Sequence, residues 1–189
     1  IGPKDISECQ ARPVRPGDAR PVSVVTVKGI FTDEGALDSH TAVIDWGDGV
    51  MTPAVIDEVA GTFLGSHVYA TGGIFDIAVT LSDDDLSSTE QRATALVTGT
   101  RVKDGELQIV GTHSNDQVRI SRVFGNLYKV DADFMLGRVH FETFKAEEVT
   151  SIKILLGDGK DYAHIAGKIE LPALIDGGAG DDHLIAGGG

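Results

Sequence analysis

The sequence contains a single cysteine, Cys9, so no disulfide can form within the chain. Stability must therefore come from core packing or from bound metal. Cys9 lies in residues 1–16, a stretch with three prolines and no apolar period. We interpret this stretch as a linker and Cys9 as a linker residue rather than a nucleophile.

Basic residues are also few, because 16 Lys and Arg stand against 29 Asp and Glu, a formal net charge of −13. This deficit argues against nucleic acid as a partner, since phosphates require clustered Lys and Arg. No stretch approaches the roughly 18 apolar residues of a membrane span, and no signal peptide pattern opens the chain. The excess of acidic residues fits either cations as partners or a role in solubility alone. Only the positions of the acidic residues along the sequence can distinguish these two interpretations.

Helical periodicity is lacking, whereas β-branched runs with largely alternating polarity recur from Val22 onward. They cover 22–27, 41–46, 74–81 and 93–98, and Gly/Asp turns separate them. Aromatic residues make up only 6% of the chain, while 24 residues are glycine. This pattern predicts an all-β fold that begins with an antiparallel β-sandwich.

Several motifs within 17–99 occur in a characteristic order. They are Phe31 to Thr41, Asp45-Trp46-Gly47-Asp48-Gly49, Ser66-His67-Val68-Tyr69, Gly73 to Ile77 and Ser82-Asp83-Asp84-Asp85. In order and spacing this region resembles a bacterial PKD domain, an immunoglobulin-like module. The resemblance implies an extracellular or cell-surface location.

The Trp46-Gly47-Asp48-Gly49 signature has a structural interpretation of its own. Alternation turns Trp46 inward, and we expect it in the core with Val43 and Ile77. Glycine tolerates the backbone angles of a tight reversal, and Asp48 can accept hydrogen bonds from backbone amides in the turn. His40 and His67 are expected to pack or hydrogen-bond nearby, and Asp83 to Asp85 to form a solvated turn.

Residues 100–189 contain a repeat. Positions 107, 109, 116, 118 and 120 superpose on 152, 154, 161, 163 and 165 at an offset of 45, and those on 173, 175, 182, 184 and 186 at an offset of 21. Each copy is an apolar strand, a Gly/Asn/Asp turn and a second short strand. One copy cannot bury its apolar face alone, so we predict a parallel β-roll or β-helix-like coil. Two alternating segments, 127–134 and 139–144, fit an inserted hairpin.

The turns of this repeat are rich in glycine and aspartate. Residues 177–185 fit the nine-residue pattern G-G-x-G-x-D-x-U-x, 157–163 is a degenerate copy, and 114–118 is a fainter one. The region resembles the hemolysin-type calcium-binding repeats of secreted bacterial proteins, although its copies are 21 residues apart rather than nine. By that resemblance, aspartates of stacked turns share a Ca²⁺ ion, which makes Asp161 and Asp182 the candidate ligands. The turn residues Asp158, Gly159, Gly178 and Gly180 complete the candidate set. Asp116 is expected to be a turn residue without metal.

Enzyme signatures are lacking. There is no H-E-x-x-H zinc motif and no G-x-S-x-G elbow, and the paired carboxylates lie in open turns. We therefore predict a non-catalytic structural or adhesive fragment of a larger secreted or surface protein, because Gly187 to Gly189 still continue the repeat. Its expected partners are calcium, other surface proteins or polysaccharide.

Two alternatives remain open at this point. One is a carbohydrate-binding accessory module of a secreted polysaccharide-degrading enzyme, which would need a shallow patch of exposed aromatics. With Trp46 buried, the candidates are Tyr69, Tyr128 and Tyr162, which do not cluster in the sequence. The other alternative is a set of repeats that serves calcium-triggered secretion of the parent protein.

Overall fold

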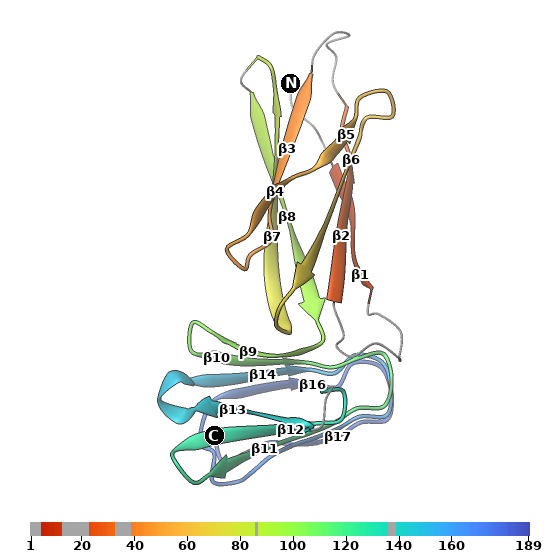
Figure 1. Cartoon of the computed structure of the whole chain (residues 1–189). Helices are drawn as coiled ribbons and strands as arrows, with labels where there is room; N and C mark the ends of the chain where they lie inside the picture. The colour runs from red at the N-terminus through yellow and green to blue at the C-terminus, as the bar shows by residue number, and fades with distance from the viewer. Residues whose placement is uncertain (1–4, 13–22, 33–38, 86, 136–138) are drawn as a thin grey trace. The chain divides into compact units, whose positions relative to one another are not determined.

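A computed structural model describes residues 5–12, 23–32, 39–85, 87–135 and 139–189 (Figure 1). Within these ranges the chain is built of β-strands, with one short 3₁₀ turn, η1 (Ala146–Glu148). The all-β fold class predicted from the sequence is confirmed. No helix in the described part is long and apolar enough to cross a membrane.

The chain forms two compact units. The first contains β1 (Asp5–Arg12), β2 (Ser23–Ile30), β3 (His40–Asp45), β4 (Met51–Pro53), β5 (Val55–Asp57), β6 (Thr62–Tyr69), β7 (Gly73–Asp83) and β8 (Ser88–Val97). The second contains β9 (Gly99–Lys103), β10 (Glu106–Val110), β11 (Gln117–Val123), β12 (Leu127–Ala132), β13 (Phe141–Lys145), β14 (Ser151–Leu155), β15 (Tyr162–Ile165), β16 (Ala173–Asp176) and β17 (His183–Ile185). The change of unit lies close to the predicted boundary after residue 99.

The first unit is a sandwich of two four-stranded sheets, ordered β1-β2-β6-β5 and β4-β3-β7-β8. The strand pairs with a described register are antiparallel. Strand β7 shows why the sheets pack, because its alternate residues are all buried: Phe75, Ile77, Val79 and Leu81. Period-two alternation thus gives each sheet one apolar face. The apolar faces of the two sheets pack against each other and form the core.

One sequence prediction fails at the start of the chain. The stretch 1–16 was expected to be a linker, yet residues 5–12 form β1, which pairs antiparallel with β2 from Asp5 opposite Ile30 to Arg12 opposite Val24. Cys9 therefore lies in a strand, opposite Val27. An edge strand is held by backbone hydrogen bonds to its neighbour, which need no apolar period in its own sequence. The other residues of 1–16 lie outside the described ranges.

The expected core is right for Trp46 and Ile77, which are fully buried, and wrong for Val43. Val43 is 43% exposed. Alternation along β3 explains the difference, because Ala42 and Ile44 point inward on the same face as Trp46, so Val43 must point outward.

The second unit is a coil of three stacked turns of chain with two sheets, in each of which the repeated strands run parallel. Strands β10, β14 and β16 pair in parallel with Leu107 opposite Ile152 and Ile152 opposite Ala173. Strands β11, β15 and β17 do the same with Val118 opposite Ala163 and Ala163 opposite Leu184. Both ladders follow the predicted offsets of 45 and 21, and Figure 1 shows the two sets of strands as two layers.

The longer first interval contains the predicted inserted hairpin. Strand β12 pairs antiparallel with β13 and also with β11, so the hairpin extends one coil sheet to the order β13-β12-β11-β15-β17. The other sheet has the order β16-β14-β10-β9. Between the layers lies a single apolar core that includes Leu107, Ile109, Val118, Ile120, Val130, Ile152, Ile154, Ala163 and Ile165.

Trp46→Ala should destabilise the sandwich by roughly 3–5 kcal/mol, because it removes a fully buried aromatic side chain from the core. The matched control is Val43→Ala on the same strand, which should change stability by about 0.5 kcal/mol, as exposed positions do. Calorimetric melting of the full chain measures both variants. Equal melting of Trp46→Ala and wild type would contradict the core position of Trp46.

Candidate functional site

Three turns of the coil, 111–116, 156–161 and 177–182, lie directly over one another. They connect β10 to β11, β14 to β15 and β16 to β17, and the strands on both sides keep the same offsets. Backbone hydrogen bonds join the second turn to the third, from Gly159 N to Ala179 O (2.8 Å) and from Ala179 N to Gly157 O (2.9 Å). Equivalent residues of the turns are therefore neighbours in space.

An aspartate ladder, formed by Asp116, Asp161 and Asp182, runs through these turns. The backbone N–H of Asp116 donates to Oδ1 of Asp161 at 2.8 Å, and the N–H of Asp161 donates to Oδ1 of Asp182 at 2.9 Å. The carboxylates of Asp161 and Asp182 thus each accept a backbone N–H of the preceding coil, which would otherwise be left unpaired at the turn.

The first two carboxylates of the aspartate ladder are buried but differently satisfied. Asp116 is 3% exposed, and Thr112 caps both of its oxygens, with N–H to Oδ2 at 2.6 Å and Oγ1 to Oδ1 at 2.9 Å. Asp161 is 1% exposed, and its Oδ2 has no hydrogen-bond partner among the described residues. The residue equivalent to Thr112 in the second turn is Gly157, which has no hydroxyl group.

Burial raises the pKa of Asp161, and the nearby carboxylates of Asp182, Asp133 and Asp158 raise it further, against the lowering effect of the Asp116 N–H. Burial likewise raises the pKa of Asp116, although the donors of Thr112 act in the opposite direction. Ionisation of these buried carboxylates is therefore unfavourable, and a proton or a cation bound at Asp161 would lower its cost.

The structure brings only part of the predicted calcium ligand set together. Asp161 and Asp182 meet in the ladder, and Gly178 and Gly180 stack on Gly157 and Gly159. Asp158 points elsewhere, because its side chain is 67% exposed and its Oδ2 lies 3.2 Å from Nδ1 of His113.

The described residues contain no group of three or more His, Cys, Asp or Glu side chains arranged to hold a metal ion. Calcium prefers six to eight oxygen ligands, so these turns do not by themselves assemble a full cage. Among the described residues, the one buried side-chain oxygen or nitrogen without a hydrogen-bond partner is Oδ2 of Asp161.

Sequence reasoning missed the role of Asp116, which was expected to be a plain turn residue. It is a full member of the ladder, and its superposition on Asp161 at the offset of 45 was the available signal. The capping by Thr112 had no such signal, because that threonine has a glycine in both other turns.

The Trp46-Gly47-Asp48-Gly49 turn uses its polar groups internally. Trp46 Nε1 donates to Thr52 Oγ1 at 2.9 Å, and Tyr69 Oη donates to the Trp46 carbonyl at 2.7 Å. Asp48 accepts from Val50 N (3.0 Å) and pairs with His67 Nε2 (2.7 Å), whose ring stacks on Trp46. The structural interpretation of Asp48 and His67 is confirmed. His40 likewise pairs with Glu58, as its expected hydrogen-bonding role requires.

No family model and no curated protein matches the sequence. Among solved structures, the PKD domain of the human VPS10 domain-containing receptor SorCS2 resembles this chain with 21% identity over 50% of this chain and 75% of that chain. Its TM-score of 0.34 is too low for this likeness to support a conclusion. The first unit has the antiparallel sandwich architecture that the PKD resemblance implied, and the calcium-repeat resemblance remains a prediction.

Gly178→Ala should destabilise the coil by more than about 2 kcal/mol, because residue 178 has φ +81° and a Cβ there would overlap the carbonyl oxygen of Gly157. Gly167→Ala is the matched control, since nothing lies within 4 Å of its Cβ position. Urea unfolding of the full chain compares the two. A Gly178→Ala variant as stable as Gly167→Ala would show that the turns are not stacked in this way.

Asp161→Asn should weaken the pH dependence of stability in the presence of a chelator. With the pKa of Asp161 raised in the folded state, the folded chain holds that proton to higher pH than the unfolded chain. Stability is therefore lost as pH rises from the ordinary aspartate pKa of about 3.9 through the raised value. Asparagine keeps the Oδ1 acceptor without the charge, so the variant should lose less stability over this range and be at least as stable as wild type at neutral pH.

Melting curves between about pH 4 and pH 7 measure this difference. Asp158→Asn, an exposed change in the same turn, removes only the smallest of the charges that raise the pKa of Asp161 and should change the profile much less than Asp161→Asn does. A profile of Asp161→Asn that matches wild type throughout would mean that Asp161 is charged at no cost to the fold.

Proposed function

We propose that this chain is a non-catalytic structural unit of a larger extracellular or cell-surface protein. In this proposal the sandwich serves as a spacer, and the coil is a rigid extension that calcium stabilises at the aspartate ladder. The observation that carries the proposal is the buried Oδ2 of Asp161, which lies in a stack of acidic turns and has no hydrogen-bond partner in the part of the chain that the structure describes.

The spacer role rests on the Trp46 turn. Its indole nitrogen, its carbonyl and the Asp48 carboxylate are all engaged by neighbouring residues of the sandwich. A motif whose polar atoms are internally satisfied stabilises the fold and leaves little for a ligand. This is the arrangement expected of a module that separates other parts of a protein.

The calcium role rests on charge. Stacked strands are about 4.8 Å apart, and like charges at that separation repel strongly in a buried site. Asp161 and Asp182 would hold the ion, with carbonyls of their glycine turns. The ion would supply positive charge at the Oδ2 that lacks a donor. Because the remaining ligands are not gathered in advance, we expect an affinity on the order of 0.1–1 mM, as for other extracellular modules.

The test is thermal melting of the full chain in calcium and in chelator, at matched ionic strength, with magnesium in a parallel series. Calcium should raise the midpoint of the coil transition, because it binds the folded coil and not the unfolded chain. Asp161→Asn and Asp182→Ala should lose most of this rise, and Asp158→Asn should keep it. An unmoved wild type at several times the expected dissociation constant, about 5 mM, would show that the turns are a metal-free scaffold.

A further inference from the structure

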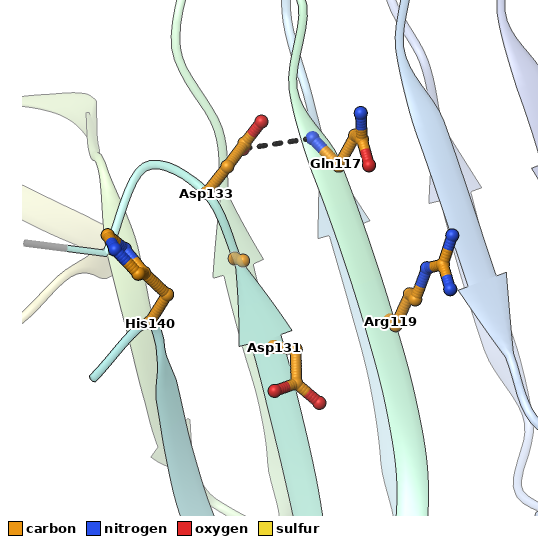
Figure 2. A pocket seen from close by; sticks show the side chains of 6 residues that line it. Gln117, Arg119, Asp131, Asp133 and His140 are labelled. Atoms are coloured by element: carbon orange, nitrogen blue, oxygen red, sulfur yellow. Dashed lines mark hydrogen bonds between the residues drawn. The ribbon is translucent and has the colours of Figure 1, made fainter.

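We propose that the outward face of the sheet β13-β12-β11-β15-β17 contains a binding site for a neutral saccharide. The site is a shallow pocket of about 310 Å³ lined by Gln117, Arg119, Asp131, Ala132, Asp133 and His140 (Figure 2). Its volume is at the lower end of the range of small-molecule sites, which begins near 300 Å³. This inference does not depend on calcium or on the proposed spacer role.

The pocket lies where the inserted hairpin meets the coil. Val118 and Ile120 of β11 are buried in the core, so Gln117 and Arg119 point outward. Arg119 stands opposite Asp131 of β12 on one side and His164 of β15 on the other. The repeat alone would present only Gln117 and Arg119, and the inserted hairpin adds the other four lining residues, both carboxylates among them.

Arg119 is held in place without an ionic partner. Its guanidinium carbon lies 5.1 Å from the ring centroid of Tyr162, and that ring stacks on His183 at 5.5 Å with an angle of 20° between the planes. Within the described residues the guanidinium forms no ion pair and no hydrogen bond. Figure 2 shows its side chain directed away from Asp131, which pairs with Lys129 instead. Stacking therefore orients a donor group whose N–H bonds are unused.

The acceptors of the pocket are also oriented by the fold. Oδ1 of Asp133 accepts the backbone N–H of Gln117 at 2.9 Å, which leaves Oδ2 for another partner (Figure 2). His140 Nδ1 lies 2.7 Å from the Met135 carbonyl, and because a carbonyl can only accept, Nδ1 donates. In the neutral ring Nε2 is then an acceptor.

These groups match the chemistry of sugar hydroxyls, each of which donates and accepts. Arg119 and the Gln117 amide supply donors, while Asp131, Asp133 and His140 supply acceptors. Phe141, opposite Asp131 on β13 and 42% exposed, adds an aromatic ring beside the pocket, with the Lys129 ammonium 4.4 Å from its centroid. The two carboxylates disfavour an acidic sugar, and Arg119 disfavours a cationic peptide. A neutral saccharide, whose hydroxyls both donate and accept without carrying charge, fits this mixed set best.

The structure agrees with the sequence argument that the three tyrosines do not cluster, but it places other aromatic side chains together on this face. Tyr69 and Tyr128 are buried, so the three tyrosines do not form a surface. This face carries Phe141 and Tyr162, with His183 stacked on the tyrosine ring and His164 tilted against it, and the strand pairings bring these side chains together. Their distance in the sequence concealed this arrangement.

The test is a titration of the isotope-labelled full chain by NMR with neutral oligosaccharides, namely the glucose, xylose, mannose and N-acetylglucosamine β-linked hexamers. At least one should shift the amide signals of Gln117, Arg119, Asp131 and Asp133, with a dissociation constant on the order of 1 mM, as a small open site allows. Arg119→Ala and Asp133→Asn should each weaken binding about tenfold or more, the loss expected for a charge-assisted hydrogen bond.

Lys153→Ala on the opposite sheet is the matched control and should bind as wild type does, and unchanged melting of each variant verifies its fold. Titrations in calcium and in chelator separate this site from the aspartate ladder. The inference is overturned if no hexamer gives shifts confined to this face at about 10 mM, ten times the expected constant. It is also overturned if Arg119→Ala binds normally, or if a galacturonate hexamer binds more tightly than every neutral one.

Discussion

The parallel register of the three coils is the constraint on which the second unit depends. Because each strand pairs with the equivalent strand of the next coil, every residue of one turn lies against its counterpart. A slip of one residue would exchange the core and solvent faces of a whole strand. The same register places Asp116, Asp161 and Asp182 in a column, where each N–H can reach the next carboxylate. Burial of acidic groups is therefore a consequence of stacking, and the N–H donors make it tolerable.

The aspartate ladder has an inherent asymmetry. An asparagine column could supply a donor to every acceptor, whereas carboxylates only accept. At the first turn Thr112 provides the missing donors, and at the second turn Gly157 provides none. The glycine is nevertheless required, since residue 157 has φ +101° and a Cβ there would lie 2.3 Å from the carbonyl oxygen of Thr112. Close stacking of the turns requires glycine at position 157, whereas a hydrogen bond to Oδ2 of Asp161 would require a side chain with a donor there. The two requirements cannot both be met. Because this conflict leaves Asp161 buried with a raised pKa, we expect the stability of the coil to depend on the protonation of this residue.

How far the sequence predicts this structure depends on whether a feature repeats. The offsets of 45 and 21 predict both parallel ladders residue by residue, because equal spacing of apolar residues leaves one way to stack them. The strand β1 could not be predicted, because its pairing partner and not its own pattern defines it. Asp158 was grouped with Asp161 because both are acidic turn residues, yet its side chain lies on the exposed side of the turn. The direction of a turn side chain depends on backbone angles that the motif does not specify.

The inserted hairpin explains how a regular coil can acquire a specific surface. Repeated strands place like residues in rows, as with Tyr162 beside His183, and such rows are rigid but uniform. Strand β12 ends that uniformity, because it pairs antiparallel with β11 and brings Asp131 opposite Arg119. The aromatic row fixes the arginine, and the insertion supplies acceptors that no other coil has. A binding surface of this kind needs both parts, since the row alone lacks carboxylates and the hairpin alone lacks a rigid support.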